Sequence, residues 1–129
     1  MANQNLIHLA RILIASLFIL GGINKIFNYS AVLDTMGSAG LPLVSVLLPL
    51  TILLELAGGA LVAIGARFHV QAALTLAVFT VATNIVFHAF WGMEGSERAV
   101  EISLFFKNVV VVGALLHISA VGISNGESR

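Results

Sequence analysis

Two charged side chains lie inside long apolar stretches of this chain, where an ionisable group is costly. Glu55 is the single charge in the stretch 43–66, and Lys107 stands within the run FFKNVVVV. A charge at the centre of a bilayer costs roughly 2.5–3.5 kcal/mol on insertion scales. Groups retained there are typical of proton relays, ligand sites and ion paths. Glu55 and Lys107 are therefore the first candidates for chemistry.

Other polar residues are expected at a similar depth. Counting about 1.5 Å per residue along helices, Lys107 and Asn84 lie about 9–10 Å below the face opposite the termini, and Glu55 about 15 Å below it. His88 follows Asn84 by one turn, on the same helix face. We expect the Glu55 carboxylate to face the interior, within about 4 Å of a cationic or strongly hydrogen-bonding side chain. Lys107 is the first predicted partner and Arg11 the second.

Side-chain chemistry suggests roles for this group. Glu55 and His88 could carry protons, while Lys107 could fix charge or donate to a ligand carbonyl; these three are the catalytic candidates. Asn84 and Asn108 could orient a ligand. Alternatively, the asparagines serve only packing, through interhelical hydrogen bonds worth about 0.6 kcal/mol each. The histidines lack paired spacing such as H-x-x-x-H, so no metal site is predicted.

Four apolar runs must position these side chains. A transmembrane helix needs about 20 apolar residues, which predicts spans at 6–27, 43–65, 68–91 and 101–122. A short helix is expected at 30–37. The runs do not alternate in polarity as barrel strands do. The predicted fold is therefore an all-α integral membrane four-helix bundle, forming one domain over residues 1–129. Small residues, including Gly59 with Ala63, predict close helix packing.

Composition supports this class. Of the 129 residues, 59% are hydrophobic and 9% charged, which is too few charges to cover a soluble domain. The formal net charge is zero, which gives no reason to expect a nucleic-acid partner. The chain has no cysteine, which excludes disulfides, thiolate nucleophiles and cysteine-based metal sites within it.

An even number of spans places both termini on one side of the membrane. Arg11, Arg67 and Arg129 fall on that side, and Lys25 and Arg98 on the other. The positive-inside rule then predicts cytoplasmic termini. The first apolar run follows no basic segment and precedes no small-residue cleavage site, so it is expected to remain as a helix.

Several motifs together resemble the DoxX family of small four-helix bacterial membrane proteins. They are FILGGINKIF, GLP, ELAGGALVAIGA, NIVFHAFW and FFKNVVVVGALL. The resemblance spans nearly the whole chain and implies a bacterial inner-membrane location. Its signature positions here are Arg11, Lys25, Glu55, His88, Trp91, Lys107 and Asn108. Together with Asn84 they make up the candidate ligand-binding set.

The resemblance also implies a link to quinone or thiol redox systems, or to membrane assembly. Our first hypothesis is a redox-associated membrane subunit with a polar intramembrane site, a quinone as its cofactor and a redox protein as its partner. It would be an accessory subunit of a membrane oxidoreductase. The alternatives are a non-enzymatic assembly or partner-binding protein, and a small-solute or proton carrier. The lipid bilayer is the first expected partner, and a homo-oligomer stays open.

Overall fold

The computed structural model describes residues 3–127, and these form five helices and no strand. They are α1 (Gln4–Phe27), α2 (Tyr29–Ser38), α3 (Val44–Ile64), α4 (His69–Phe87) and α5 (Gly95–Ser124). Four of them, α1, α3, α4 and α5, are long and apolar enough to cross a membrane. The prediction of an all-α membrane bundle with four spanning helices is confirmed.

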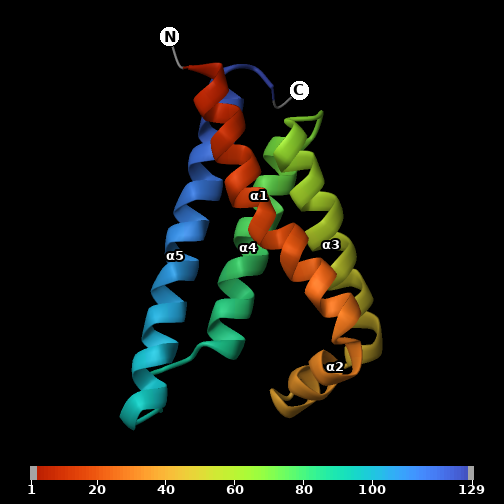
Figure 1. Cartoon of the computed structure of the whole chain (residues 1–129), viewed down its shortest axis with the longest axis vertical. Coiled ribbons are helices and arrows are strands. Elements are labelled where there is room, and N and C mark those ends of the chain that lie inside the picture. Colours follow the sequence, from red (N-terminus) through yellow and green to blue (C-terminus); the bar gives the residue numbers. More distant parts are fainter. Residues whose placement is uncertain (1–2, 128–129) are drawn as a thin grey trace.

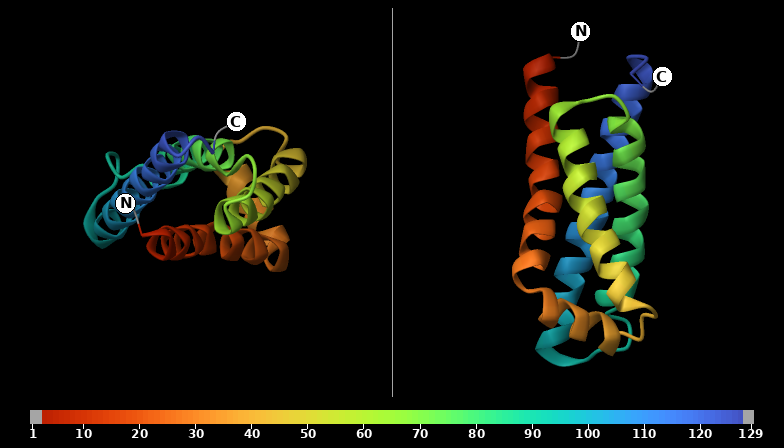
Figure 2. Two further views of the ribbon diagram at one scale, coloured as in Figure 1. Left: turned by 90° about the horizontal axis from the view of Figure 1, so that it is seen from above. Right: turned by 90° about the vertical axis from the view of Figure 1, so that its right-hand side faces the viewer.

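Two helix pairs build the bundle. α1 packs mainly against α3 and α4 against α5, and the contact of α3 with α4 joins the pairs. Both ends of the chain lie at the same end of the bundle, called here the terminal end (Figures 1 and 2). The short α2 lies across the opposite end, called the α2 end.

The hydrophobic core lies toward the terminal end. Its buried side chains include Ala15 of α1, Val62 of α3, Leu76 of α4 and Leu115 of α5. All buried residues of α5 fall between Leu115 and Gly122. The first half of α5 therefore has no buried residue, and the two pairs diverge toward the α2 end (Figure 1).

Short connections set the directions of α3 and α4. α3 ends at Gly65, whose φ of +63° is the left-handed conformation that glycine adopts without strain. Gly65 N–H donates to Val62 O, and α4 starts after only a few residues, at His69. A link this short makes α3 and α4 antiparallel neighbours, as their sequence predicts.

The predicted bounds of the last two spanning helices need correction. The helix predicted at 68–91 ends at Phe87, and the one predicted at 101–122 begins at Gly95 and continues to Ser124. The length of an apolar run indicates only the part of a helix that crosses the membrane core. α5 continues into polar residues beyond that core, and the acidic Glu97 in its first turn interacts favourably with the helix dipole. The predicted spans 6–27 and 43–65 and the short helix predicted at 30–37 differ from α1, α3 and α2 by no more than two residues at either end.

Candidate functional site

The Glu55 carboxylate is buried in the bundle and paired with a cation. Lys25 Nζ lies 3.0 Å from Oε1 and 2.9 Å from Oε2 of Glu55. The Glu55 side chain is 8% exposed and that of Lys25 25% exposed. The prediction that this carboxylate faces inward beside a cation is confirmed.

The predicted identity of that cation is wrong, since neither Lys107 nor Arg11 pairs with Glu55. The reason is the helix order. Glu55 faces α1, where an added Cβ at Gly21 would lie only 3.3 Å from its Oε1. Lys25 is one turn beyond Gly21 on the same face of α1, whereas Lys107 belongs to α5, which packs on α4.

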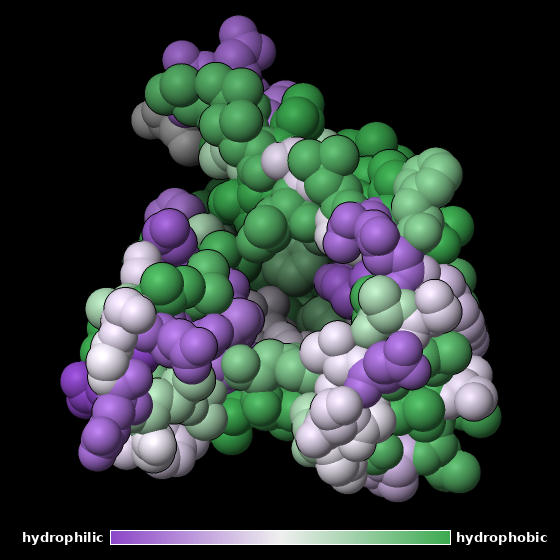
Figure 3. Space-filling model, turned by 60° about the horizontal axis from the view of Figure 1, so that its bottom comes forward, coloured by the Kyte–Doolittle hydropathy of each residue, from purple (hydrophilic) through white to green (hydrophobic). Residues whose placement is uncertain are grey.

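A cavity of about 540 Å³ opens beside this pair at the α2 end. Viewed from that end, the molecule is hollowed at its centre, with an apolar interior and hydrophilic patches on the rim (Figure 3). The lining residues come from α1 to α4 and the loop before α3, and His88 adds to them. They are Lys25, Val32, Thr35, Met36, Leu41, Leu47, Thr51, Glu55, Phe79, Ala82, Thr83, Val86, Phe87 and His88.

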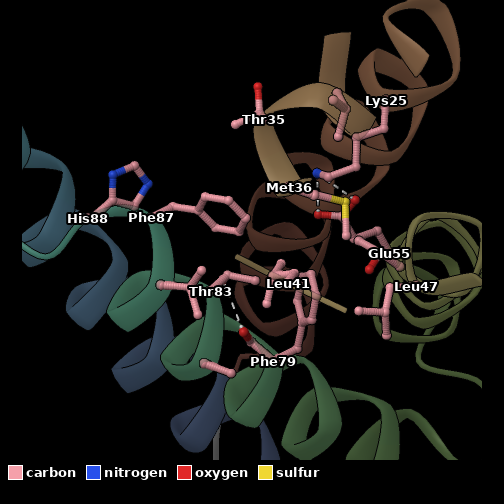
Figure 4. A pocket seen from close by; sticks show the side chains of 14 residues that line it. Lys25, Thr35, Met36, Leu41, Leu47, Glu55, Phe79, Thr83, Phe87 and His88 are labelled. Atoms are coloured by element: carbon pink, nitrogen blue, oxygen red, sulfur yellow. Dashed lines mark hydrogen bonds and ion pairs between the residues drawn. The ribbon is translucent and has the colours of Figure 1, made fainter. Parts of the chain in front are cut away.

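The ion pair forms one polar wall of this cavity. Figure 4 shows Lys25 and Glu55 on one side, with the ring of Phe87 and the imidazole of His88 across from them. Within residues 3–127, Glu55 Oε2 accepts no aligned hydrogen bond, although it lies 2.9 Å from Lys25 Nζ. This oxygen is buried within the wall, where Lys25 balances its charge.

A second polar pair stands beside the cavity. His88 Nδ1 lies 2.7 Å from Oε2 of Glu101, a residue of α5. The carboxylate accepts the Nδ1 proton, which fixes the ring and leaves Nε2 as the free ring nitrogen. Sequence reasoning identified His88 but missed Glu101, because the partner comes from another helix and no local spacing links the two.

The asparagines join α4 to α5. Asn84 Nδ2 donates to Phe105 O at 3.1 Å, and Asn108 Nδ2 donates to Asn84 Oδ1 at 3.0 Å. Asn108 also lines a smaller cavity of about 200 Å³ that shares Lys25 and Glu55 with the larger one. The packing contacts predicted as the alternative role are therefore present, and Asn108 also reaches the polar site.

The remaining candidates lie outside both cavities. Lys107 is exposed on α5 and has no hydrogen bond or ion pair to the described part of the chain. Trp91 is 63% exposed in the turn after α4, with its ring 6.2 Å from that of Phe105. Arg11 is buried at the terminal end, where it contacts His69 and Glu127. Sequence reasoning missed the last two as its partners.

Comparisons with known proteins agree with this architecture. The DoxX family model matches residues 6–89. The inner membrane protein YphA of Escherichia coli (strain K12) is 26% identical, over 94% of this chain and 86% of that protein. The inner membrane protein YqjF of the same organism is 36% identical, over 88% of this chain and 81% of that protein. No solved structure matches. With four membrane-crossing helices, the family match over most of the chain and these two relatives, the chain belongs to the DoxX family.

Proposed function

We propose that this protein is a redox-associated subunit of the bacterial inner membrane that binds a quinone-like ligand in the 540 Å³ cavity. The observation that carries the proposal is the Lys25–Glu55 pair, which forms a charged wall in an otherwise largely apolar cavity. An apolar pocket with a few convergent polar groups is the usual form of a small-molecule site. The inner-membrane location is inferred from YphA and YqjF.

The cavity suits a flat, lipophilic ring with carbonyl groups. Its volume lies within the range of about 300–1,000 Å³ that is usual for small-molecule pockets. Phe79 and Phe87 supply aromatic walls. The Lys25 ammonium can donate to a carbonyl oxygen, and the buried Glu55 carboxylate holds that ammonium at the cavity wall. When bound, a quinone would supply reversible uptake of electrons together with protons.

His88 and Glu101 give the same cavity a proton-exchanging group. Glu101 holds Nδ1 of His88, which leaves Nε2 as the nitrogen through which this lining residue would exchange protons. Glu55 and Lys25 stabilise opposite charges deeper in the cavity. In this proposal the chain therefore binds the ring, orients its oxygens and moves protons, while electrons come from a partner protein.

Binding can be tested by filling the cavity with a bulky side chain. Thr83→Phe places an aromatic ring in the lining, and we expect it to weaken binding of a short-tailed benzoquinone at least tenfold. Thr75→Phe is the matched control, because Thr75 is exposed on the same helix and, like Thr83, donates to the carbonyl four residues earlier. Binding would be measured by thermal shift in detergent, where a ligand at 100 times its Kd adds about 2.7 kcal/mol.

Two results would contradict the quinone proposal. One is the absence of any stabilisation of the unmodified protein by the benzoquinone. The other is equal loss of binding in Thr83→Phe and Thr75→Phe, which would place the ligand on the lipid-facing surface.

The orientation of the bundle is a further part of the proposal: both termini face the cytoplasm. Arg11 and Arg67 lie toward the terminal end, and Lys25 and Arg98 toward the α2 end. Reporter domains fused after residue 127 and within the 92–94 turn should report opposite sides, with the first active in the cytoplasm. Cytoplasmic activity of the 92–94 fusion would reverse the orientation.

A second candidate function is supported by Lys107. This cation is exposed in the membrane-crossing part of α5, on a half of the helix that buries no residue. An unpaired cation on such a face suits a membrane partner that supplies an acceptor, as in an assembly protein. Loss of partner co-purification in Lys107→Met, with benzoquinone binding unchanged, would favour this candidate over the first.

A further inference from the structure

A second polar cluster lies at the terminal end, remote from the proposed quinone cavity. Arg11 of α1 and His69 of α4 are 4% and 1% exposed. Arg11 Nη2 lies 3.1 Å from His69 Nε2, and the two nitrogens lie 2.9 Å and 3.2 Å from one oxygen, Oε2 of Glu127. Two buried nitrogens on different helices thus converge on a single oxyanion.

The helices around these nitrogens are shaped to leave room for them. A Cβ added at Gly65 would collide with the Arg11 guanidinium. One added at Gly122 would come within 2.8 Å of His69 Nε2. His69 Nδ1 lies 3.0 Å from Ala66 O, to which it donates, so Nε2 is left to accept from Arg11 Nη2 and orients the guanidinium toward the oxyanion. The room for both side chains is therefore set by the link between α3 and α4 and by Gly122 of α5.

Glu127, in contrast, approaches from outside. Its side chain is 37% exposed, and it follows the C-cap of α5 in a turn where Gly126 has a φ of +73°. The backbone N–H of Glu127 donates to Gly122 O at 2.9 Å. Glu127 is the sole acidic side chain that the described residues place at this end. The arrangement is a preformed cationic site with an occupant on a short external turn.

The surroundings indicate what else could occupy the site. It lies where the membrane-crossing helices end, which is the level of lipid headgroups. Large apolar side chains are exposed around this end, including Ile64 at 70%, Phe68 at 53% and Ile123 at 55%. Arg67, stacked 5.0 Å from the Phe68 ring, adds an exposed cation. Cations beside exposed apolar side chains are suited to a phosphate attached to acyl chains.

We propose that Arg11, held in place by His69, forms a phosphate-binding site at the terminal end, and that the Glu127 carboxylate occupies it as an internal competitor. A phosphate group, from a phospholipid headgroup or free in solution, takes the place of the carboxylate and releases the turn that carries Glu127. The guanidinium binds two phosphate oxygens through its paired N–H groups. This site is independent of the proposed quinone function.

The internal competitor gives the proposal a distinctive consequence. A group tethered by a short chain acts at an effective concentration of about millimolar, so it lowers the apparent affinity for an external anion. Removing the Glu127 carboxylate should therefore strengthen phosphate binding. If the cluster serves only to hold the C-terminal turn, removing this carboxylate should instead lower stability without strengthening phosphate binding.

The test titrates purified protein in neutral detergent with phosphatidylglycerol, with diacylglycerol of the same chains, and with inorganic phosphate. Native mass spectrometry measures lipid binding, and thermal shift measures all three. We expect Glu127→Ala to bind phosphatidylglycerol at least tenfold more tightly than the unmodified protein, with no gain for diacylglycerol. Glu97→Ala, which removes an exposed carboxylate at the other end of the bundle, should leave binding unchanged.

Two further variants complete the design. Adding Arg11→Gln to Glu127→Ala should abolish the gain. If Glu127→Ala does not fold without lipid, Glu127→Gln, which keeps the side-chain shape, is titrated instead with a gain of at least threefold expected. A gain with inorganic phosphate equal to that with phosphatidylglycerol assigns the site to free phosphate. Unchanged affinity for both phosphatidylglycerol and inorganic phosphate, or an equal gain with diacylglycerol, would overturn the proposal.

Discussion

Lys25→Met is expected to lower the free energy of unfolding by about 3–5 kcal/mol, because it leaves the Glu55 carboxylate buried without its cation. The same substitution at Lys107 is the matched control. Lys107 is exposed and makes no ion pair with the described residues, so Lys107→Met should change stability little or increase it within a membrane. Denaturation of the purified variants in detergent would measure both effects.

The double variant separates scaffold from site at this pair. Replacing a buried ion pair by apolar residues is often neutral or stabilising, so Glu55→Leu added to Lys25→Met should recover most of the lost stability. If the pair binds the ligand as proposed, the double variant folds but loses benzoquinone binding. A double variant that is stable and still binds the benzoquinone would show that the pair is structural.

Gly59→Ala is expected to cost about 1–3 kcal/mol, the usual range for overpacking a close contact. The added Cβ would lie 2.9 Å from Cγ1 of Ile19 and 3.4 Å from Ala15 O. The backbone oxygen cannot move without shifting α1, so α1 and α3 would have to separate. Because the Lys25–Glu55 pair spans this same interface, benzoquinone binding should weaken together with stability.

Gly113→Ala is the control for this prediction. Nothing lies within 4 Å of a Cβ at Gly113, which is exposed on α5. There the change should be neutral, or stabilising by up to about 1 kcal/mol through helix propensity. Thermal unfolding in one detergent compares the two variants directly. Equal melting temperatures for both would mean that α1 and α3 do not pack as closely as the structure has them.

Hydropathy determined the spanning helices, because the transfer of side chains into a bilayer depends on local composition and length. It also placed Glu55 at mid-depth and required a partner for it, since an unpaired charge is costly there. The small residues at Gly59 and Ala63 correctly predicted close packing, and Gly59 indeed faces Ile19 and Ala15 of α1.

Depth along a helix does not say which helix is the neighbour. From the sequence, Lys25 and Lys107 are both expected in the half of the bundle that holds Glu55, so sequence spacing could not decide which of them pairs with it. Helix packing decided it, since Gly21 and Gly22 bring α1 against Glu55 and Leu56 while α5 packs on α4.

The same reason explains the partners that sequence missed. Glu101 meets His88 across the α4–α5 turn, and Glu127 meets Arg11 across almost the whole chain. These contacts join residues whose local sequences carry no shared pattern. Sequence determined which residues enter the membrane and how deep they lie, because solvation is a local property. Only the tertiary structure decided which side chains meet, because that depends on how the helix surfaces fit together.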